Sequence, residues 1–292
     1  MDKRKLKKVI NFIFSFFIAF FIFLVLIMTS TRFSVMNERY FIKTLDKVDY
    51  YKNTALELNR FIRLNAVPSG FPTEMFEGYI TEEDIRSDMI EYEMKMFNHE
   101  EADISTKKID KRIRNTVNTY IVKNNIIMNE SLDIGVEAFI TAIVKQYSYL
   151  TKFPYINMYA DLVTRFNKIY VIATPILLTL IAVLTVLMIK INTRAKRRRE
   201  YGSYVFIGSG LLVGALPTVM LAEKFFQKIS LNPKYMYDLI VALGRNYLII
   251  NVILGLILIG VGLLLILVKI KKRESRQKSR NSMLMKNIVH EN

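Results

Sequence analysis

The sequence predicts an all-α polytopic membrane protein, with four transmembrane helices and a helical extracytoplasmic domain between the first and the second. Its 292 residues combine 52% hydrophobic residues with a formal net charge of +16, which is unusual for a soluble chain. Four stretches of about 20 residues are almost wholly apolar, the length that crosses a hydrocarbon core of about 30 Å. The expected spans are residues 9–29, 168–190, 204–222 and 246–268.

The first span follows a basic leader, residues 1–8, as the apolar part of a secretory signal peptide does. Its apolar run contains seven Phe and exceeds the roughly 7–15 residues of a signal peptide, so we expect an uncleaved anchor. The chain has no cysteine. Disulfides, thiolate metal sites and a cysteine nucleophile are therefore excluded.

Clusters of basic residues predict the orientation in the membrane, because Lys and Arg in short loops and tails stay on the cytoplasmic side. They lie in the leader, in the loop 191–203 and in the tail 269–292, which places both termini in the cytoplasm. We expect the tail to lie on the headgroups or to lack regular structure. The residues that carry this prediction are Lys3, Arg4, Lys5, Arg194, Lys196, Arg197, Arg198, Arg199, Lys271, Lys272 and Arg273.

The segment between the first two spans has no such excess: residues 31–166 contain 18 Lys and Arg against 20 Asp and Glu. The high net charge therefore reflects membrane orientation. We expect an anionic lipid bilayer as the partner of the basic segments, and no nucleic acid.

The expected extracytoplasmic domain, residues 30–167, has helical periodicity. Apolar residues at positions 41, 45, 48, 51, 55, 58 and 62 form one stripe and predict a single helix, which ends at the turn sequence VPSGFP. A second helix is expected after Thr81, which can cap it, with Ile85, Met89, Tyr92 and Met96 buried. A third is expected after Ser105 or Thr106, and Ser131 is expected to open a fourth.

No Gly or Pro interrupts residues 156–173, so we expect the helix at 157–167 to continue into the second span. Such a helix would carry movement of the domain into the membrane. In the short loop 223–245, the aromatic residues would rest on the headgroups or cover the base of the larger domain.

The sequence contains few groups suited to catalysis. Asp84, Asp88 and Glu91 share one helical face, where carboxylates can do acid–base work or bind calcium; a solvated face opposite the apolar stripe explains the same spacing. The basic residues 107–114 could pair with these acids across the domain, or meet phosphate-bearing envelope polymers or lipid headgroups. His99 lies beside three acidic residues, as in a divalent cation site or in an acidic loop. We assign no catalytic residue, cofactor or metal, and treat these four residues as a candidate site.

Gly210 and Gly214 form a G-x-x-x-G pattern in the third span, and further glycines lie in the fourth. This pattern favours close helix packing, within one chain or between the copies of a homo-oligomer. The apolar cores of the four spans contain no charged residue, which disfavours a coupled transporter.

The stretches STRFSVMNERYFIKTLDKVDYY and SGFPTEMFEGYITEEDIRSD, together with the layout of the spans, resemble uncharacterised four-span integral membrane proteins of low-GC Gram-positive bacteria. This resemblance implies a multi-pass protein of the bacterial plasma membrane. The order of a span, a large domain and three spans also resembles the permeases of mechanotransmission-type ABC systems. The basic loop 191–203, however, leaves little room for the helix that engages their ATPase.

The function expected from these observations is non-enzymatic. The domain would bind an envelope component or a membrane protein partner, as an envelope sensor, a scaffold or a regulatory subunit. The alternatives are a permease-like subunit of an ABC-type export complex and an envelope-modifying membrane enzyme.

Overall fold

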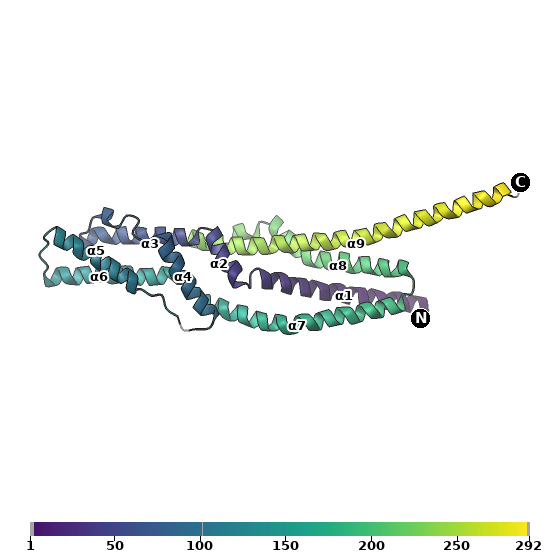
Figure 1. Cartoon of the computed structure of the whole chain (residues 1–292), viewed down its shortest axis with the longest axis horizontal. Coiled ribbons are helices and arrows are strands. Elements are labelled where there is room, and N and C mark those ends of the chain that lie inside the picture. Colours follow the sequence, from purple (N-terminus) through teal and green to yellow (C-terminus); the bar gives the residue numbers. More distant parts are fainter. Residues whose placement is uncertain (1–2, 101, 291–292) are drawn as a thin grey trace. The chain divides into compact units, whose positions relative to one another are not determined.

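The computed structural model describes residues 3–100 and 102–290, and every regular element in that part of the chain is helical (Figure 1). Four helices are long and apolar enough to cross a membrane, so the predicted all-helical fold with four candidate spans is confirmed. The chain divides into two compact units. The membrane unit comprises Met1–Met36, Phe166–Ser230 and Leu243–Asn292, and the helical unit comprises Asn37–Arg165 and Leu231–Ala242.

The membrane unit is built around α1 (Lys3–Phe33). Ile18 and Ala19 of α1 form a buried cluster with Met188 of α7 (Ile156–Ile191) and Val205 of α8 (Ala195–Ala222). The amides of Asn11 and Asn192 donate to each other's oxygens at 3.2 and 2.7 Å, and both side chains are buried. An amide pair of this kind links two helices where lipid offers no hydrogen bonds.

Polar residues also join α1 to α9 (Lys234–His290). Ser30 donates to Asn251, which is fully buried, at 2.9 Å, and Thr31 donates to the hydroxyl of Tyr247 at 3.1 Å. The guanidinium of Arg32 lies 4.5 Å from the ring centre of Tyr170 of α7.

Glycines bring α8 and α9 into contact, as the G-x-x-x-G pattern predicts. A Cβ atom on Gly210 would lie 2.7 Å from the carbonyl oxygen of Gly255, and one on Gly214 would lie 3.5 Å from the Cα of Gly255. A Cβ on Gly262 would meet Ile207 at 2.6 Å. The glycines therefore pack within this chain.

The helical unit contains five complete α-helices and parts of two more. The complete helices are α2 (Glu38–Lys47), α3 (Tyr50–Ala66), α4 (Glu82–Phe97), α5 (Lys107–Lys123) and α6 (Glu130–Thr151). Two short 3₁₀ turns, η1 (Val67–Ser69) and η2 (Thr73–Phe76), form the expected turn region after α3. The largest fully buried side chains include Leu45, Leu58, Ile62, Phe76, Ile85, Met89, Ile113, Ile140 and Ile143.

The single helix predicted over residues 41–62 is wrong, because the chain kinks at Asp49. Asp49 has a left-handed backbone (φ 53°), which Asp adopts more readily than most residues, and α3 begins at the next residue. The apolar stripe survives the kink, since Phe41 and Leu45 on α2 and Leu58 and Ile62 on α3 are all buried. The spacing of the apolar residues therefore gives no sign of the kink, because the stripe continues across it.

Helix α4 matches the prediction at its start, where the hydroxyl of Thr81 accepts a hydrogen bond from the backbone N–H of Asp84. The other caps differ. Thr106 precedes α5 without a side-chain cap, and Asn129 rather than Ser131 caps α6 by accepting from the backbone of Leu132. Asn at this position is among the strongest helix caps.

Helix α7 is one continuous helix, as expected, and its first turns belong to the helical unit while the rest belongs to the membrane unit. Helix α9 also belongs to both units, because it begins at Lys234 in the helical unit, well before the expected span. In the helical unit, Tyr235 donates to Glu57 at 2.6 Å and its ring lies edge-on to Tyr50. Tyr235 therefore covers part of the helical unit, which is one of the two roles expected for the aromatic residues of this loop.

The basic segments are more helical than expected. Helix α8 begins at Ala195, so only Asn192–Arg194 separate it from α7, and α9 continues through residues 269–290. Of the two alternatives expected for the tail, the one without regular structure is therefore wrong. The segment contains no Gly or Pro and is rich in Lys, Arg and Met, which favour helix.

Candidate functional site

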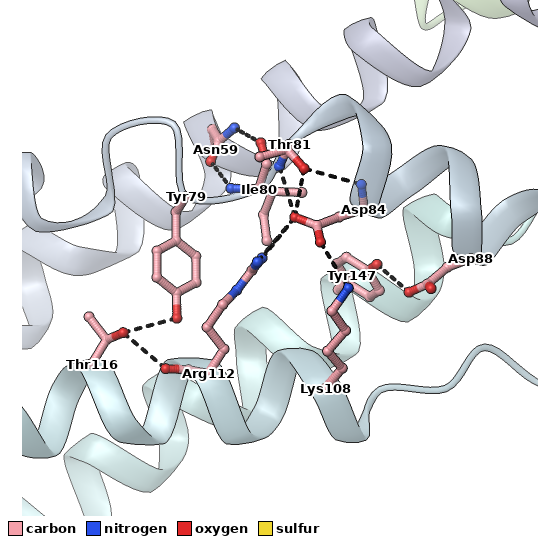
Figure 2. Close-up of polar contacts among 10 residues, drawn as sticks. All are labelled: Asn59, Tyr79, Ile80, Thr81, Asp84, Asp88, Lys108, Arg112, Thr116 and Tyr147. Carbon is pink, nitrogen blue, oxygen red and sulfur yellow. Dashed lines mark hydrogen bonds and ion pairs between the residues drawn. The ribbon is translucent and has the colours of Figure 1, made fainter.

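Asp84 lies at the centre of a polar cluster between α4 and α5 (Figure 2). Its Oδ2 accepts hydrogen bonds from the backbone N–H of Thr81 at 3.1 Å and from the Thr81 hydroxyl at 2.9 Å. Both terminal nitrogens of Arg112 donate to the same oxygen at 3.1 Å, and Lys108 reaches Oδ1 at 3.3 Å. One carboxylate thus caps α4 and ties it to two cations of α5.

This arrangement keeps Asp84 ionised. Partial burial alone would raise its pKa, but the hydrogen bonds from Thr81 and the charge of Arg112 outweigh it and lower the pKa to about 2. Arg112 is itself fixed, with its guanidinium 4.9 Å from the ring centre of Tyr79. Asp84 is therefore suited to a permanent structural anion rather than to proton transfer.

Three further contacts in Figure 2 connect α4, α5 and α6 to their neighbours. Tyr147 of α6 donates to Asp88 at 2.5 Å, and the hydroxyls of Tyr79 and Thr116 are 3.2 Å apart. Asn59 of α3 donates to the carbonyl of Ile80 and accepts from its N–H, at 2.7 and 2.9 Å. The cluster fixes the helices relative to one another.

The carboxylates predicted as a candidate site thus have separate partners. Asp84 bonds to α5, Asp88 bonds to α6, and Glu91 accepts from Lys95 one turn along α4 at 2.6 Å in an exposed pair. Of these three carboxylates, Asp84 is the one that the structure pairs with the basic residues 107–114. Across residues 3–100 and 102–290, no three His, Asp or Glu side chains are placed to share a metal ion.

His99 lies apart from these carboxylates. Its backbone is left-handed (φ 59°), its Nε2 is 2.9 Å from the hydroxyl of Thr164, and its Nδ1 is 3.6 Å from Asp161 of α7. It borders an open cavity of about 670 Å³, within the size range of ligand pockets. Other residues around that cavity are Tyr92, Met96, Glu100, Ala102, Asp103, Asn157 and Asp161. Lys152 pairs with Asp103 at 2.5 Å, so one of the acidic groups is already neutralised.

Glu93 is not among the residues that the sequence singled out, yet it is the most deeply buried carboxylic acid in the part of the chain that the structure describes. Its exposure is 0%, and within the described residues neither of its oxygens has a hydrogen-bond partner. Burial, and secondarily the charge of Glu38, raises the pKa of Glu93 to about 8. A signal was present, because Ile85, Met89, Glu93 and Phe97 recur every four residues, on the same face of α4.

The basic residues assigned to lipid differ in their surroundings. Lys5, Arg194, Lys196 and Arg197 are exposed. Arg198 donates to the carbonyl oxygens of Asn192 and Thr193 at 2.6 and 3.3 Å, which caps the end of α7. The side chains of Lys3, Arg4, Lys271, Lys272 and Arg273 lie outside the described part of the structure.

Comparison with protein-family models, with curated proteins and with solved structures finds no match in any of the three.

Proposed function

We propose that this chain is a non-enzymatic membrane scaffold or sensor, whose helical unit lies outside the cytoplasm and docks a protein partner through the tip of the α5–α6 hairpin. The observation that carries the proposal is the exposure of this tip, which we define as residues 122–135. All of its residues are exposed, and six are large and apolar: Val122, Ile126, Ile127, Met128, Leu132 and Ile134.

The exposure at the tip is large. Val122 and Ile127 retain 75% and 87% of their accessible surface, although the loop between them could have folded back onto the helices. Contiguous apolar surface of this kind on a helical domain is typical of an interaction site. It is also costly to leave in water, at about 25 cal/mol per Å².

The charges on the tip favour a protein over an anionic bilayer as the occupant. Lys123 is the single basic residue of the tip, and Glu130 and Asp133 are acidic and exposed. An anionic membrane would repel the acidic residues, whereas membrane-binding segments are rich in Lys and Arg. The tip suits a partner whose apolar groove has basic residues at its edge.

The helix that leaves the helical unit provides the route to the membrane. Helix α7 continues from the helical unit into a candidate span without a break, so a rotation of its first turns reaches the span directly. Placement outside the cytoplasm is supported by the excess of Lys and Arg in the leader, the α7–α8 link and the tail.

A photoreactive amino acid at position 127, in cells, tests the docking surface. We expect one discrete protein adduct from position 127, and its loss when Ile126→Ser and Met128→Ser are combined with the probe. The matched control is the same probe at Leu64, which is exposed on α3 and should not give this adduct. Adducts to lipid, or the same adduct from both positions, would rule out the proposal.

Deletion of residues 40–150 provides a second test. The shortened chain should insert into the membrane and no longer co-purify with the partner that the adduct identifies. Failure to insert would instead give the domain a structural role.

A further inference from the structure

Glu93 lies one turn before the point at which α4 contacts α2 and α7. Phe97, one turn further along the same face of α4, lies 6.5 Å from Phe41 of α2 and 5.7 Å from Tyr159 of α7, measured between ring centres. Phe41 and Tyr159 are 5.0 Å apart. The buried carboxyl group is thus close to the contact between α2 and the first turns of α7. Helix α2 follows α1 in the chain, and α7 continues into a candidate span.

The titratable groups around Glu93 come from each neighbouring helix, and the nearest are acids. Glu38 of α2 acts on its ionisation, and the charge of Glu93 in turn acts on Tyr50 and Tyr51 of α3, Tyr159 of α7 and Tyr92 of α4. The Tyr51 hydroxyl is buried and, like Glu93, has no hydrogen-bond partner in the described chain.

The nearest basic groups are engaged elsewhere. Arg86, two turns before Glu93 on α4, pairs with Asp46 at 3.2 Å, and Lys152, directly after α6, pairs with Asp103 at 2.5 Å. Neither acts on the ionisation of Glu93. A charge at this position would be buried without a counter-ion, which is among the most unfavourable arrangements in a protein interior.

We propose that Glu93 is a proton-binding site, neutral when α2 and α7 are packed on α4, and that loss of its proton loosens these two helices. The site stands on its own geometry; its use to regulate partner docking rests on the proposed function. The external signal would then be a rise in pH.

The direction follows from linkage. Burial raises the pKa of Glu93 from 4.5 to about 8, so between these values the folded protein holds a proton that the opened protein releases. The contribution of the neutral acid is fully present below pH 4.5 and is lost as the pH rises through about 8. Above that pH, Glu93 is ionised in both the packed and the open state, so the free energy of opening no longer depends on pH.

The test is hydrogen exchange of the full chain in lipid nanodiscs, followed by mass spectrometry between pH 6 and 9. We expect opening of residues 38–47 and 156–165, corrected for intrinsic exchange, to increase by roughly tenfold per pH unit and to level off near pH 8. Glu93→Gln should abolish this dependence. An identical pH profile in the wild type and in Glu93→Gln would overturn the proposal.

Two other variants keep the test decisive if Glu93→Gln folds poorly. Glu38→Gln removes the facing charge, so levelling should occur at a lower pH. Glu91→Gln changes an exposed carboxylate on the same helix and should leave the profile unchanged. A profile that responds to Glu91→Gln and not to Glu38→Gln would contradict the assignment.

The adduct formed from position 127 separates this proposal from the function proposed for the tip. Exchange is measured without a partner, so it tests the proton site even if no adduct forms. Where the adduct forms, its yield should fall between pH 6 and 9 in the wild type and stay constant in Glu93→Gln. An equal fall in both would refute the regulatory link.

Discussion

Gly210 and Gly255 face each other across α8 and α9 at a separation that excludes any side chain. A Cβ on Gly210 would lie 2.7 Å from the carbonyl oxygen of Gly255, and a Cβ on Gly255 would lie 2.8 Å from that of Gly210. Backbone atoms form both contacts, so the obstacle cannot rotate away. The separation of these two helices therefore depends on both residues.

Substitution at this contact should destabilise the membrane unit. Gly210→Ala forces the helices apart, and overpacking of this kind costs about 1–3 kcal/mol. We expect a lower midpoint of thermal unfolding in detergent. Gly260→Ala is the control, because nothing lies within 4 Å of a Cβ there. Equal effects of the two substitutions would show that helix propensity, rather than this contact, is responsible.

The reciprocal amides of Asn11 and Asn192 should be energetically coupled. Each side chain donates to the other, and removal of one leaves the other buried without that partner. A double-mutant cycle with Asn11→Ala and Asn192→Ala should give about 0.6 kcal/mol and at most about 1.7 kcal/mol, the range for hydrogen bonds between membrane helices. Additive single effects, measured by unfolding in detergent, would show that the pair contributes nothing.

Loss of the Asp84 carboxylate should destabilise the helical unit. Asp84→Asn keeps the shape of the cap and removes the charge that binds Arg112, at a cost of about 1.5–3 kcal/mol by analogy with other hydrogen bonds to charged groups. The measurement is denaturant unfolding followed by circular dichroism. Glu91→Gln, which changes an exposed carboxylate of the same helix, should have little effect.

The pH dependence of this contact has the opposite sign to that of Glu93. The lowered pKa of Asp84 gives stability that is present above 3.8 and is lost as the pH falls through about 2. Wild-type protein should therefore lose stability in that acidic window more steeply than Asp84→Asn. Parallel curves would mean that the ion pair is screened by solvent.

The absence of cysteine makes the orientation directly measurable. Tyr149→Cys and Lys196→Cys each introduce one exposed thiol, in the helical unit and at the start of α8 respectively. A membrane-impermeant maleimide should label the first in intact cells and the second only after permeabilisation. The reverse result would place the helical unit in the cytoplasm and contradict the proposed function.

The helical fold was predictable because apolar length and 3.6-residue periodicity are strong local signals. The contact of Gly210 and Gly214 with α9 was predictable for the same reason, since small residues at a spacing of four allow helices to approach. The kink at Asp49 was not, because nothing in KVDYY requires a break and the buried stripe continues past it.

The candidate site was harder to predict. Asp84 and Asp88 lie one turn apart on α4, but their partners lie on two other helices, α5 and α6, which the sequence of α4 cannot reveal. Glu93 was overlooked because Ile85, Met89, Tyr92 and Met96 already form an apolar stripe on α4. Glu93 is nevertheless fully buried, and Phe97, one turn further along, contacts α2 and α7. Two overlapping stripes can be read from the same helix, and the choice between them is made by tertiary packing.

The pairing of Tyr235 with Glu57 and Tyr50 has a consequence for biosynthesis. The helical unit is closed by residues 231–242, which are translated after three of the four candidate spans. During synthesis the domain formed by residues 37–165 is therefore incomplete, and the surface around Tyr50 stays uncovered until the start of α9 has been translated. Chaperones and membrane proteases that recognise exposed aromatic surface have that interval in which to act on the chain.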